Sequence, residues 1–201
     1  MNRGVIDMVI LIGAESCTGK TLMAQNLLEK YHISYISVDL IKMGLFRANI
    51  NCGFIPSDSN EHIESILFPI LKGIIETTIE NNQNLIIEGA YIFPNRLKEF
   101  EEEYRKKIIP VFMGFSHKYI KSHFDSGIIQ YRSAIEQKDV ADDWTTEWFI
   151  DGNKKMKARC LESQIKYFEI DENYDNEIKK VYEWIDISVK NINNNGEYKE
   201  I

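Results

Sequence analysis

Residues 14–21 read Ala-Glu-Ser-Cys-Thr-Gly-Lys-Thr, the most informative stretch of this chain of 201 residues. An apolar run at residues 8–13 precedes it, and a helix-like segment at residues 22–31 follows it. A strand, then a loop of small residues ending in Gly-Lys-Thr, then a helix is the context in which such a loop binds phosphate. We therefore predict a phosphate-binding loop here, rather than a chance Gly-Lys-Thr in an unrelated turn.

Each part of the predicted loop has a physical task. Backbone N–H groups around a tight loop point inward at anionic oxygens, and the helix N-terminus adds unpaired donors and positive dipole charge. We expect Lys20 to reach the β- and γ-phosphates of a nucleotide and the Thr21 hydroxyl to hold Mg²⁺. Ala14 stands where the consensus has its first glycine, a departure that we treat as minor. The predicted loop comprises Ala14, Glu15, Ser16, Cys17, Thr18, Gly19, Lys20 and Thr21.

Composition limits the kind of protein. Acidic residues outnumber basic ones by 31 to 24, which gives a formal net charge of −7. This balance argues against nucleic acid or an anionic membrane as the main partner. Hydrophobic residues make up 44% of the chain, enough for the core of one domain.

Cysteines and apolar runs indicate the compartment. Cys17, Cys52 and Cys160 form no CxxC pair, so we expect reduced thiols rather than a disulfide framework or a zinc site. No apolar run reaches the ~18 residues of a membrane span, and the run before Glu15 is too short for a signal peptide. We expect a soluble cytoplasmic protein.

Strand and helix signals alternate along the chain. The helical period is clearest over residues 61–81 and continues past Pro69, and we also expect helices at residues 40–48, 94–107 and 178–189. Residues 191–201 are expected to form a frayed tail. Such alternation predicts an α/β fold, a doubly wound parallel sheet of five strands. The expected strands are residues 8–12, 35–39, 85–89, 108–115 and 166–170.

Two expected strands end on a carboxylate. Asp39 closes the second strand and Glu88 closes the third, and ligands of parallel sheets bind beyond these strand ends. A carboxylate there could orient or deprotonate an accepting hydroxyl, or contribute to Mg²⁺ binding. The alternative for Asp39 is a helix N-cap, and for Glu88 an ion pair or a cap.

This arrangement resembles the P-loop small-molecule kinases, which include adenylate, shikimate and gluconate kinases, chloramphenicol phosphotransferase, zeta toxins and 2-phosphoglycerate kinase-like proteins. The motif match is tight at residues 14–21 and looser at residues 37–39 and 85–96. The resemblance implies a P-loop NTPase of the nucleotide-kinase type, with residues 1–190 as a single domain. It also implies ATP and Mg²⁺ as cofactors.

The resemblance assigns roles residue by residue. The acid after the second strand, Asp39, is implied as the base, and Lys42 stands where adenylate kinases have an arginine. Lys cannot replace the bidentate phosphate contacts of Arg, which puts a nucleoside-monophosphate acceptor in doubt. A lid is implied at residues 117–143, with Arg132 as its arginine. The alternatives to Arg132 are Lys118, Lys121 and Lys138.

The leading hypothesis is an ATP-dependent phosphotransferase that moves the γ-phosphoryl group of Mg-ATP to a hydroxyl or a phosphate of a small polar molecule. Its predicted catalytic residues are Lys20, Asp39 and Arg132; its acceptor residues are Asp39, Lys42, Arg47 and Glu88; and its metal ligands are Thr21, Asp39 and Glu88.

The alternative hypothesis is a nucleotide-binding regulatory or toxin-like module that acts through a protein partner. Its contact would be the acidic surface and the aromatic segment with Trp144 and Trp148, which we otherwise interpret as core residues.

Overall fold

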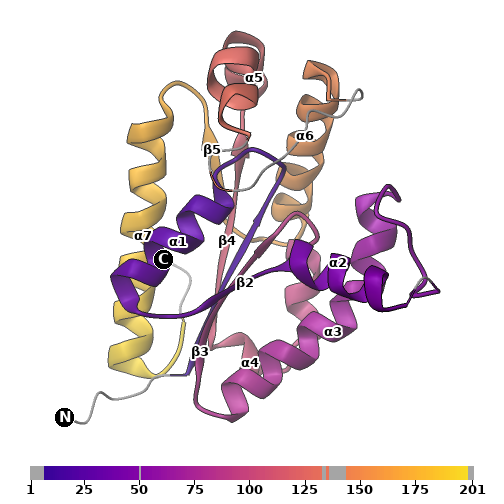
Figure 1. Ribbon diagram of the computed structural model, residues 1–201. Coiled ribbons are helices and arrows are strands. Elements are labelled where there is room, and N and C mark those ends of the chain that lie inside the picture. The colour runs from indigo at the N-terminus through magenta and orange to yellow at the C-terminus, as the bar shows by residue number, and fades with distance from the viewer. Residues whose placement is uncertain (1–6, 50, 133–134, 136–143, 199–201) are drawn as a thin grey trace.

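The computed structural model describes residues 7–49, 51–132, 135 and 144–198. Within these residues, five strands form one parallel sheet in the order β2-β3-β1-β4-β5 (Figure 1). The expected fold class is therefore confirmed. The strands are β1 (Met8–Ala14), β2 (Tyr35–Ser37), β3 (Asn84–Gly89), β4 (Ile108–Phe115) and β5 (Tyr167–Ile170).

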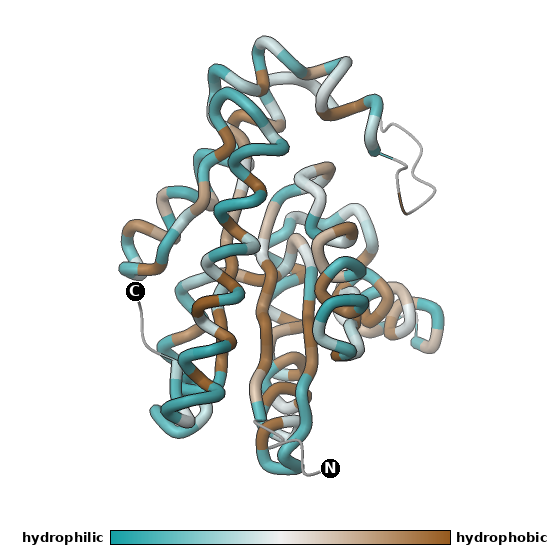
Figure 2. Tube along the Cα trace, turned by 90° about the vertical axis from the view of Figure 1, so that its left-hand side faces the viewer, coloured by the Kyte–Doolittle hydropathy of each residue, from teal (hydrophilic) through white to brown (hydrophobic). Residues whose placement is uncertain are grey.

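The central strand β1 is buried along its whole length, as its apolar sequence requires. Its side chains alternate between two core clusters on the two faces of the sheet. Ile10 and Ile12 pack in the first cluster, while Val9 and Leu11 pack in the second. The strands accordingly form the hydrophobic centre of the molecule in Figure 2.

Helices cover both faces of the sheet. α1 (Lys20–Tyr31), α5 (His117–His123) and α7 (Tyr174–Asn195) pack on the first cluster. α2 (Val38–Ala48) and α3 (Asn60–Glu80) pack on the second. α6 (Thr146–Glu162) contributes Phe149 to the first cluster and Met156 and Cys160 to the second. None of the helices in the described residues is long and apolar enough to cross a membrane.

Most predicted elements are present, with shifted bounds. Helix α3 continues through Pro69, as the apolar period indicated, and the Ser59 hydroxyl caps it by accepting from His62 N. The final helix α7 extends to Asn195, where Gly196 with φ 75° ends it, so the first part of the expected frayed tail is helical. Of that tail, residues 199–201 lie outside the described residues.

One predicted helix is wrong. The helix expected at residues 94–107 is instead a 3₁₀ segment, η1 (Pro94–Glu99), and a single turn, α4 (Glu102–Arg105). Extended backbone at Phe100 separates them and places that ring in the core. α6 buries Phe149, Asn153, Met156 and Cys160, and Trp144 and Trp148, interpreted as core residues, are half-buried and pack against the first cluster.

A buried ion pair joins η1 to α3. Arg96 Nε and Nη2 donate to Glu64 Oε1 and Oε2 at 2.7 and 2.9 Å, and the Glu64 side chain is only 4% exposed. We expect Arg96→Ala to lower the free energy of unfolding by about 3 kcal/mol, because it leaves the Glu64 carboxylate buried without its partner. Urea unfolding measures the change. Arg105→Ala, at an exposed position of α4, is the control and should change stability by less than about 0.5 kcal/mol.

Candidate functional site

The loop between β1 and α1 has the backbone geometry of an anion site. Cys17 and Gly19 have positive φ values of 61° and 87°, which turn the chain tightly. The Thr18 hydroxyl donates to Glu15 O at 2.7 Å and closes the loop on itself. Such turns direct backbone N–H groups toward one point, so the loop can surround an anionic oxygen.

The N-terminus of α1 is left open to that point. Its cap residue, Gly19, supplies no side-chain hydrogen bond, and the first turn contains no acidic residue. The unpaired N–H groups and the positive end of the helix dipole are therefore available to an anion. A side chain at position 19 would overlap the Tyr174 hydroxyl, which donates to Thr18 O at 3.2 Å. Glycine is thus required by both its φ value and its neighbour.

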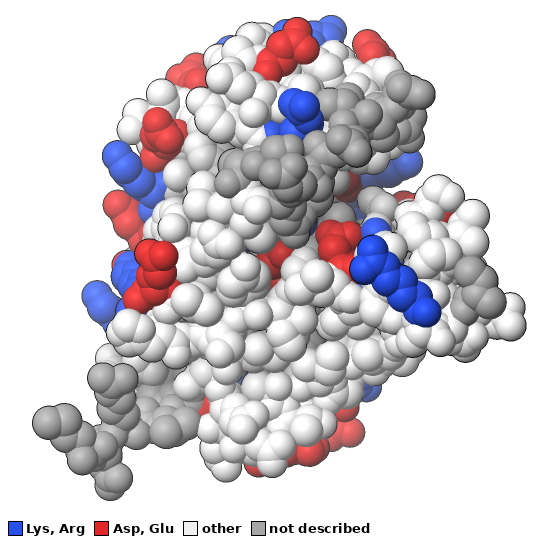
Figure 3. Space-filling view, viewed as in Figure 1, with Lys and Arg blue, Asp and Glu red and all other residues white. Residues whose placement is uncertain are grey.

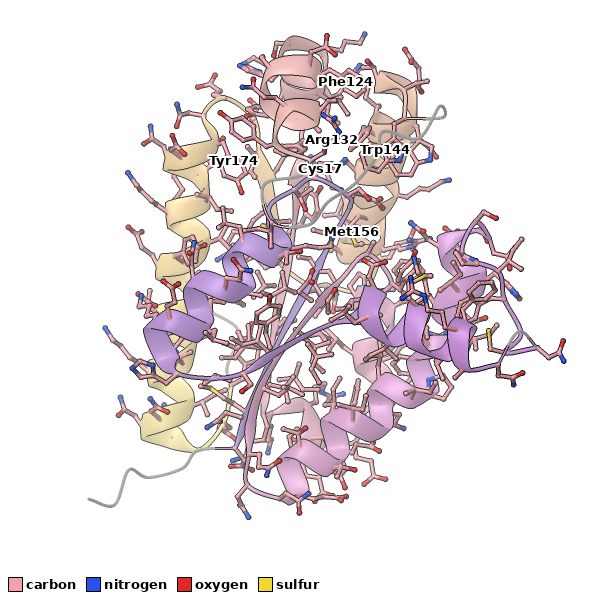
Figure 4. All side chains as sticks on the ribbon, in the orientation of Figure 1. Cys17, Phe124, Arg132, Trp144, Met156 and Tyr174 are labelled. Carbon is pink, nitrogen blue, oxygen red and sulfur yellow. The ribbon has the colours of Figure 1, made fainter. Side chains whose placement is uncertain are left out.

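A cavity of about 520 Å³ opens beside this helix end. Lys20 and Thr21 line it from α1, Arg132 from the segment after α5, and Asn173 and Tyr174 from the N-cap and first residue of α7. Figure 4 shows Cys17, Arg132 and Tyr174 at the same end of the sheet, although they are far apart in sequence. Three predicted residues, Lys20, Thr21 and Arg132, are therefore brought together around one space.

Lys20 and Arg132, two cations that line this cavity, have hydrogen-bond donors that no described residue accepts. Lys20 is 4% exposed, and its ammonium makes no hydrogen bond or ion pair with another described residue. Arg132 Nη1 donates to Ile129 O at 3.1 Å, whereas its buried Nε has no partner in the described part of the chain. A buried cation is costly unless an anion compensates it, so both side chains favour a negatively charged ligand.

Aromatic rings form the far wall of the cavity, a feature that sequence reasoning missed. Phe115, Tyr119 and His123 stack in series, with centroid distances of 4.9 and 4.4 Å. Tyr119 and His123 line the cavity, and their i, i+4 spacing in α5 was the available signal, whereas Phe115 is the last residue of β4. Burial raises the pKa of Tyr119 and of Tyr174, so both phenols stay neutral near pH 7.

Glu88 lies at the end of β3, completely buried. Its neighbours in register are Ile12 of β1 and Ser37 of β2, so it sits beside the strand that leads into the loop. The Ser37 hydroxyl is buried and has no hydrogen-bond partner among the described residues.

The second strand ends two residues earlier than predicted, before Asp39. β2 ends at Ser37, which occupies the cap position of α2, so Asp39 lies in the first helical turn and is not the N-cap. Its carboxylate pairs with Lys42 Nζ at 2.9 Å. Local helix geometry accounts for this pair, because residues i and i+3 share a helix face.

Lys42 is held in the protein by two partners. Its ammonium also donates to the Tyr91 hydroxyl at 2.7 Å, and the residue is 8% exposed. Burial lowers the pKa of Lys42, but the Asp39 charge and the hydrogen bonds to Tyr91 and Asp39 outweigh it, so the net shift is upward. Arg47, in contrast, is exposed at the end of α2, where no contact joins it to Asp39 or Lys42.

The donor set fits Mg²⁺ bound largely through phosphate. No group of three or more His, Cys, Asp or Glu side chains that could hold a metal ion occurs among the described residues. Mg²⁺ usually keeps several waters and takes only one or two protein ligands besides substrate phosphates. The Thr21 hydroxyl at the cavity and a nearby carboxylate are compatible with that mode.

Two solved structures share this architecture. A shikimate kinase from Bacteroides thetaiotaomicron is 12% identical, with a TM-score of 0.51 and coverage of 89% of this chain and 98% of the kinase. The chain has the fold of the P-loop small-molecule kinases. A "putative kinase" from Chloroflexus aurantiacus is 16% identical, with a TM-score of 0.54 and coverage of 90% and 97%. Neither a protein-family model nor a curated protein matches the sequence.

Part of the segment expected as a lid in this kinase-like fold is visible. After α5 the chain forms a π turn, η2 (Phe124–Ile128), and a 3₁₀ turn, η3 (Ile129–Tyr131), that bring Arg132 to the cavity. Lys118, an alternative to Arg132, instead pairs with Glu172 at 3.0 Å. Lys138 lies outside the described residues.

A second group of side chains, also missed from the sequence, lies on the other side of the loop. Arg159 of α6 lies over the Phe93 ring at 3.9 Å and pairs with Glu61 of α3 at 2.5 Å. Glu15 packs against Gly152 of α6. Because these residues come from four separate segments, no local sequence pattern could have grouped them.

Proposed function

We propose that this protein is a phosphotransferase that moves the γ-phosphoryl group of Mg-ATP to a hydroxyl of a small polar molecule. The observation that carries the proposal is the cavity of about 520 Å³, in which Lys20, Thr21 and Arg132 meet at an uncapped helix N-terminus. A triphosphate supplies the negative charge that these groups require.

On the donor side, each residue has a distinct task. The loop amides and Lys20 bind the β- and γ-phosphates, and Thr21 holds Mg²⁺ together with a carboxylate, Glu88 or Asp39. Arg132 places positive charge at the phosphates. The nucleobase lies along the aromatic wall near Tyr119 and the start of α7 at Tyr174.

On the acceptor side, Asp39 takes the hydroxyl proton, and Lys42 and Arg47 belong to the helix beside the acceptor. Residues 1–190 act as one kinase-like domain, in which residues 117–143 close over the phosphates. Closure excludes water, which would otherwise accept the phosphoryl group.

The direct test is transfer of labelled γ-phosphate from Mg-ATP to pooled small acceptors. The pools contain nucleosides, nucleotides, sugars, phosphoglycerates and antibiotics, and a reaction without acceptor measures hydrolysis. A labelled product above that background supports the kinase, and dividing the pool identifies its acceptor. Binding of ATP without transfer to any pool would contradict the proposal.

The proposed base gives a separate prediction. Asp39→Asn keeps the size of the side chain but cannot accept a proton, so kcat should fall by about 10²–10⁴-fold. ATP affinity, measured by calorimetry, should remain near the wild-type value, because Asp39 does not line the donor cavity. Lys42→Met is the comparison, since it removes the ion pair but keeps the carboxylate. Full turnover by Asp39→Asn would exclude Asp39 as the base.

A further inference from the structure

We take the acceptor side of the proposed function to be the part of the β1–α1 loop that carries Glu15 and packs against α6. The cavity lining includes Cys17, Gly19, Lys20 and Thr21 but not Glu15. α2 and α6 flank this side of the loop in Figure 1, and Figure 3 shows a hollow in the same region with acidic and basic side chains at its edge. The charged side chains on this side of the loop determine whether an anionic, a neutral or a cationic acceptor fits best.

Each cation held within the acceptor side already has a carboxylate partner. Lys42 pairs with Asp39 at 2.9 Å, and Arg159 pairs with Glu61 at 2.5 Å. On the outer face of α6, Lys155 pairs with Asp151 at 2.7 Å. An anionic acceptor would have to compete with these internal carboxylates for every one of them.

Arg47 is a further cation of this region in the sequence, but it lies on a different face of α2 from Lys42. It follows Lys42 by five residues, which places it about 140° away around the helix axis. It is exposed, in keeping with that position. It therefore adds no positive charge to the face that Lys42 and Asp39 share.

Glu15 is an acidic side chain whose burial is only partly compensated: burial raises its pKa, and the charges of Lys20, Arg159 and Lys155 act against that rise. The residue is only 5% exposed, and its carboxylate makes no hydrogen bond or ion pair with any described residue. It lies against α6 where Gly152 leaves room: a Cβ at Gly152 would come within 2.9 Å of the Glu15 carboxyl carbon. The cations that act on it are Lys20, Arg159 and Lys155, two of which are paired elsewhere and one of which faces the phosphates.

We propose that the acceptor is a hydroxylated small molecule that carries a positively charged amino group, and that Glu15 binds this ammonium. The inference rests on the proposed function. A phosphate or carboxylate on the acceptor would face a buried carboxylate, and a neutral acceptor would leave that carboxylate without a partner. An ammonium group forms the charge-assisted hydrogen bonds that Glu15 lacks.

The first test sorts acceptors by charge. The labelled-ATP assay is run with an amine pool (amino sugars, aminocyclitols and amino alcohols), a neutral pool (sugars, polyols and nucleosides) and an anionic pool (sugar phosphates, nucleotides and hydroxy acids). We expect the fastest transfer in the amine pool. Faster transfer in another pool overturns the inference but leaves the kinase standing. Transfer in none overturns the proposed function and this inference with it.

The second test examines Glu15 with the best amine acceptor. Glu15→Gln removes the charge and should raise KM for the acceptor by about tenfold or more, while KM for ATP changes little. Glu15→Asp keeps the charge and should recover part of the affinity. Glu162→Gln makes the same change at an exposed position of α6, the helix against which Glu15 packs, and is the matched control. Equal effects of Glu15→Gln on both KM values would indicate a structural role and overturn the assignment.

Discussion

Replacing Lys20 by alanine is expected to abolish phosphoryl transfer, with a fall in rate of about 10³-fold. The Lys20 ammonium lines the donor cavity, is 4% exposed and pairs with no described residue, so its charge is available to the transferring phosphate. Positive charge at that place stabilises the transition state more than the bound ground state. Transfer of labelled γ-phosphate measures the loss, and calorimetry with ATP separates it from loss of binding.

The thermal stability of Lys20→Ala is the control that separates loss of activity from loss of folding. An unpaired buried charge is unfavourable for folding, so Lys20→Ala should not lower the midpoint of thermal unfolding. Lys30→Ala, near the other end of α1, removes a partly exposed ion pair with Asp186 and should leave transfer unchanged. Wild-type transfer by Lys20→Ala would refute the assignment of the phosphate site to this loop.

Replacing Gly19 by alanine is expected to remove both nucleotide binding and part of the stability. A φ of 87° costs a residue with a Cβ about 1–3 kcal/mol, and the added methyl group would overlap the Tyr174 hydroxyl. To relieve the backbone strain or the overlap with Tyr174, the loop must shift. Its N–H groups then move away from the phosphate position. Urea unfolding measures the first effect, and ATP titration measures the second.

Two variants make this prediction specific. Gly73→Ala adds a methyl group in α3 where no heavy atom lies within 4 Å, so it should stabilise the protein by about 0.5–1 kcal/mol. Tyr174→Phe in the Gly19→Ala background removes the overlapping hydroxyl and should restore part of the lost stability. If the double variant is no more stable than Gly19→Ala, the contact with Tyr174 is not the cause.

The fold and the donor side follow largely from local sequence. Five apolar runs alternating with helical periods predict a parallel sheet, because buried strands and amphipathic helices are properties of short segments. The β1–α1 loop is equally local, since the Gly-Lys-Thr stretch and its flanking elements are contiguous. Arg132, which the family resemblance predicts to be the arginine of a lid, lines the cavity, and its role there stays a prediction.

The acceptor side depends on contacts between distant residues. Arg96 is held by Glu64, and Arg159 is held by Glu61 across a separation of 98 residues. Asp39 was misplaced by two residues relative to the strand end, because β2 gives way to α2 without an intervening loop. Neither periodicity nor spacing encodes such pairings.

The sequence by itself therefore determined the architecture and the place of the Gly-Lys-Thr loop between β1 and α1, because each depends on neighbouring residues or on a regular period. Only the tertiary structure decided which charges remain available. It pairs Lys42, Arg96 and Arg159 with carboxylates, whereas Lys20 and Glu15, whose charges act on each other, form no hydrogen bond or ion pair among the described residues. Net charge at a site is a sum over segments that meet only on folding, so it can be read only from the folded chain.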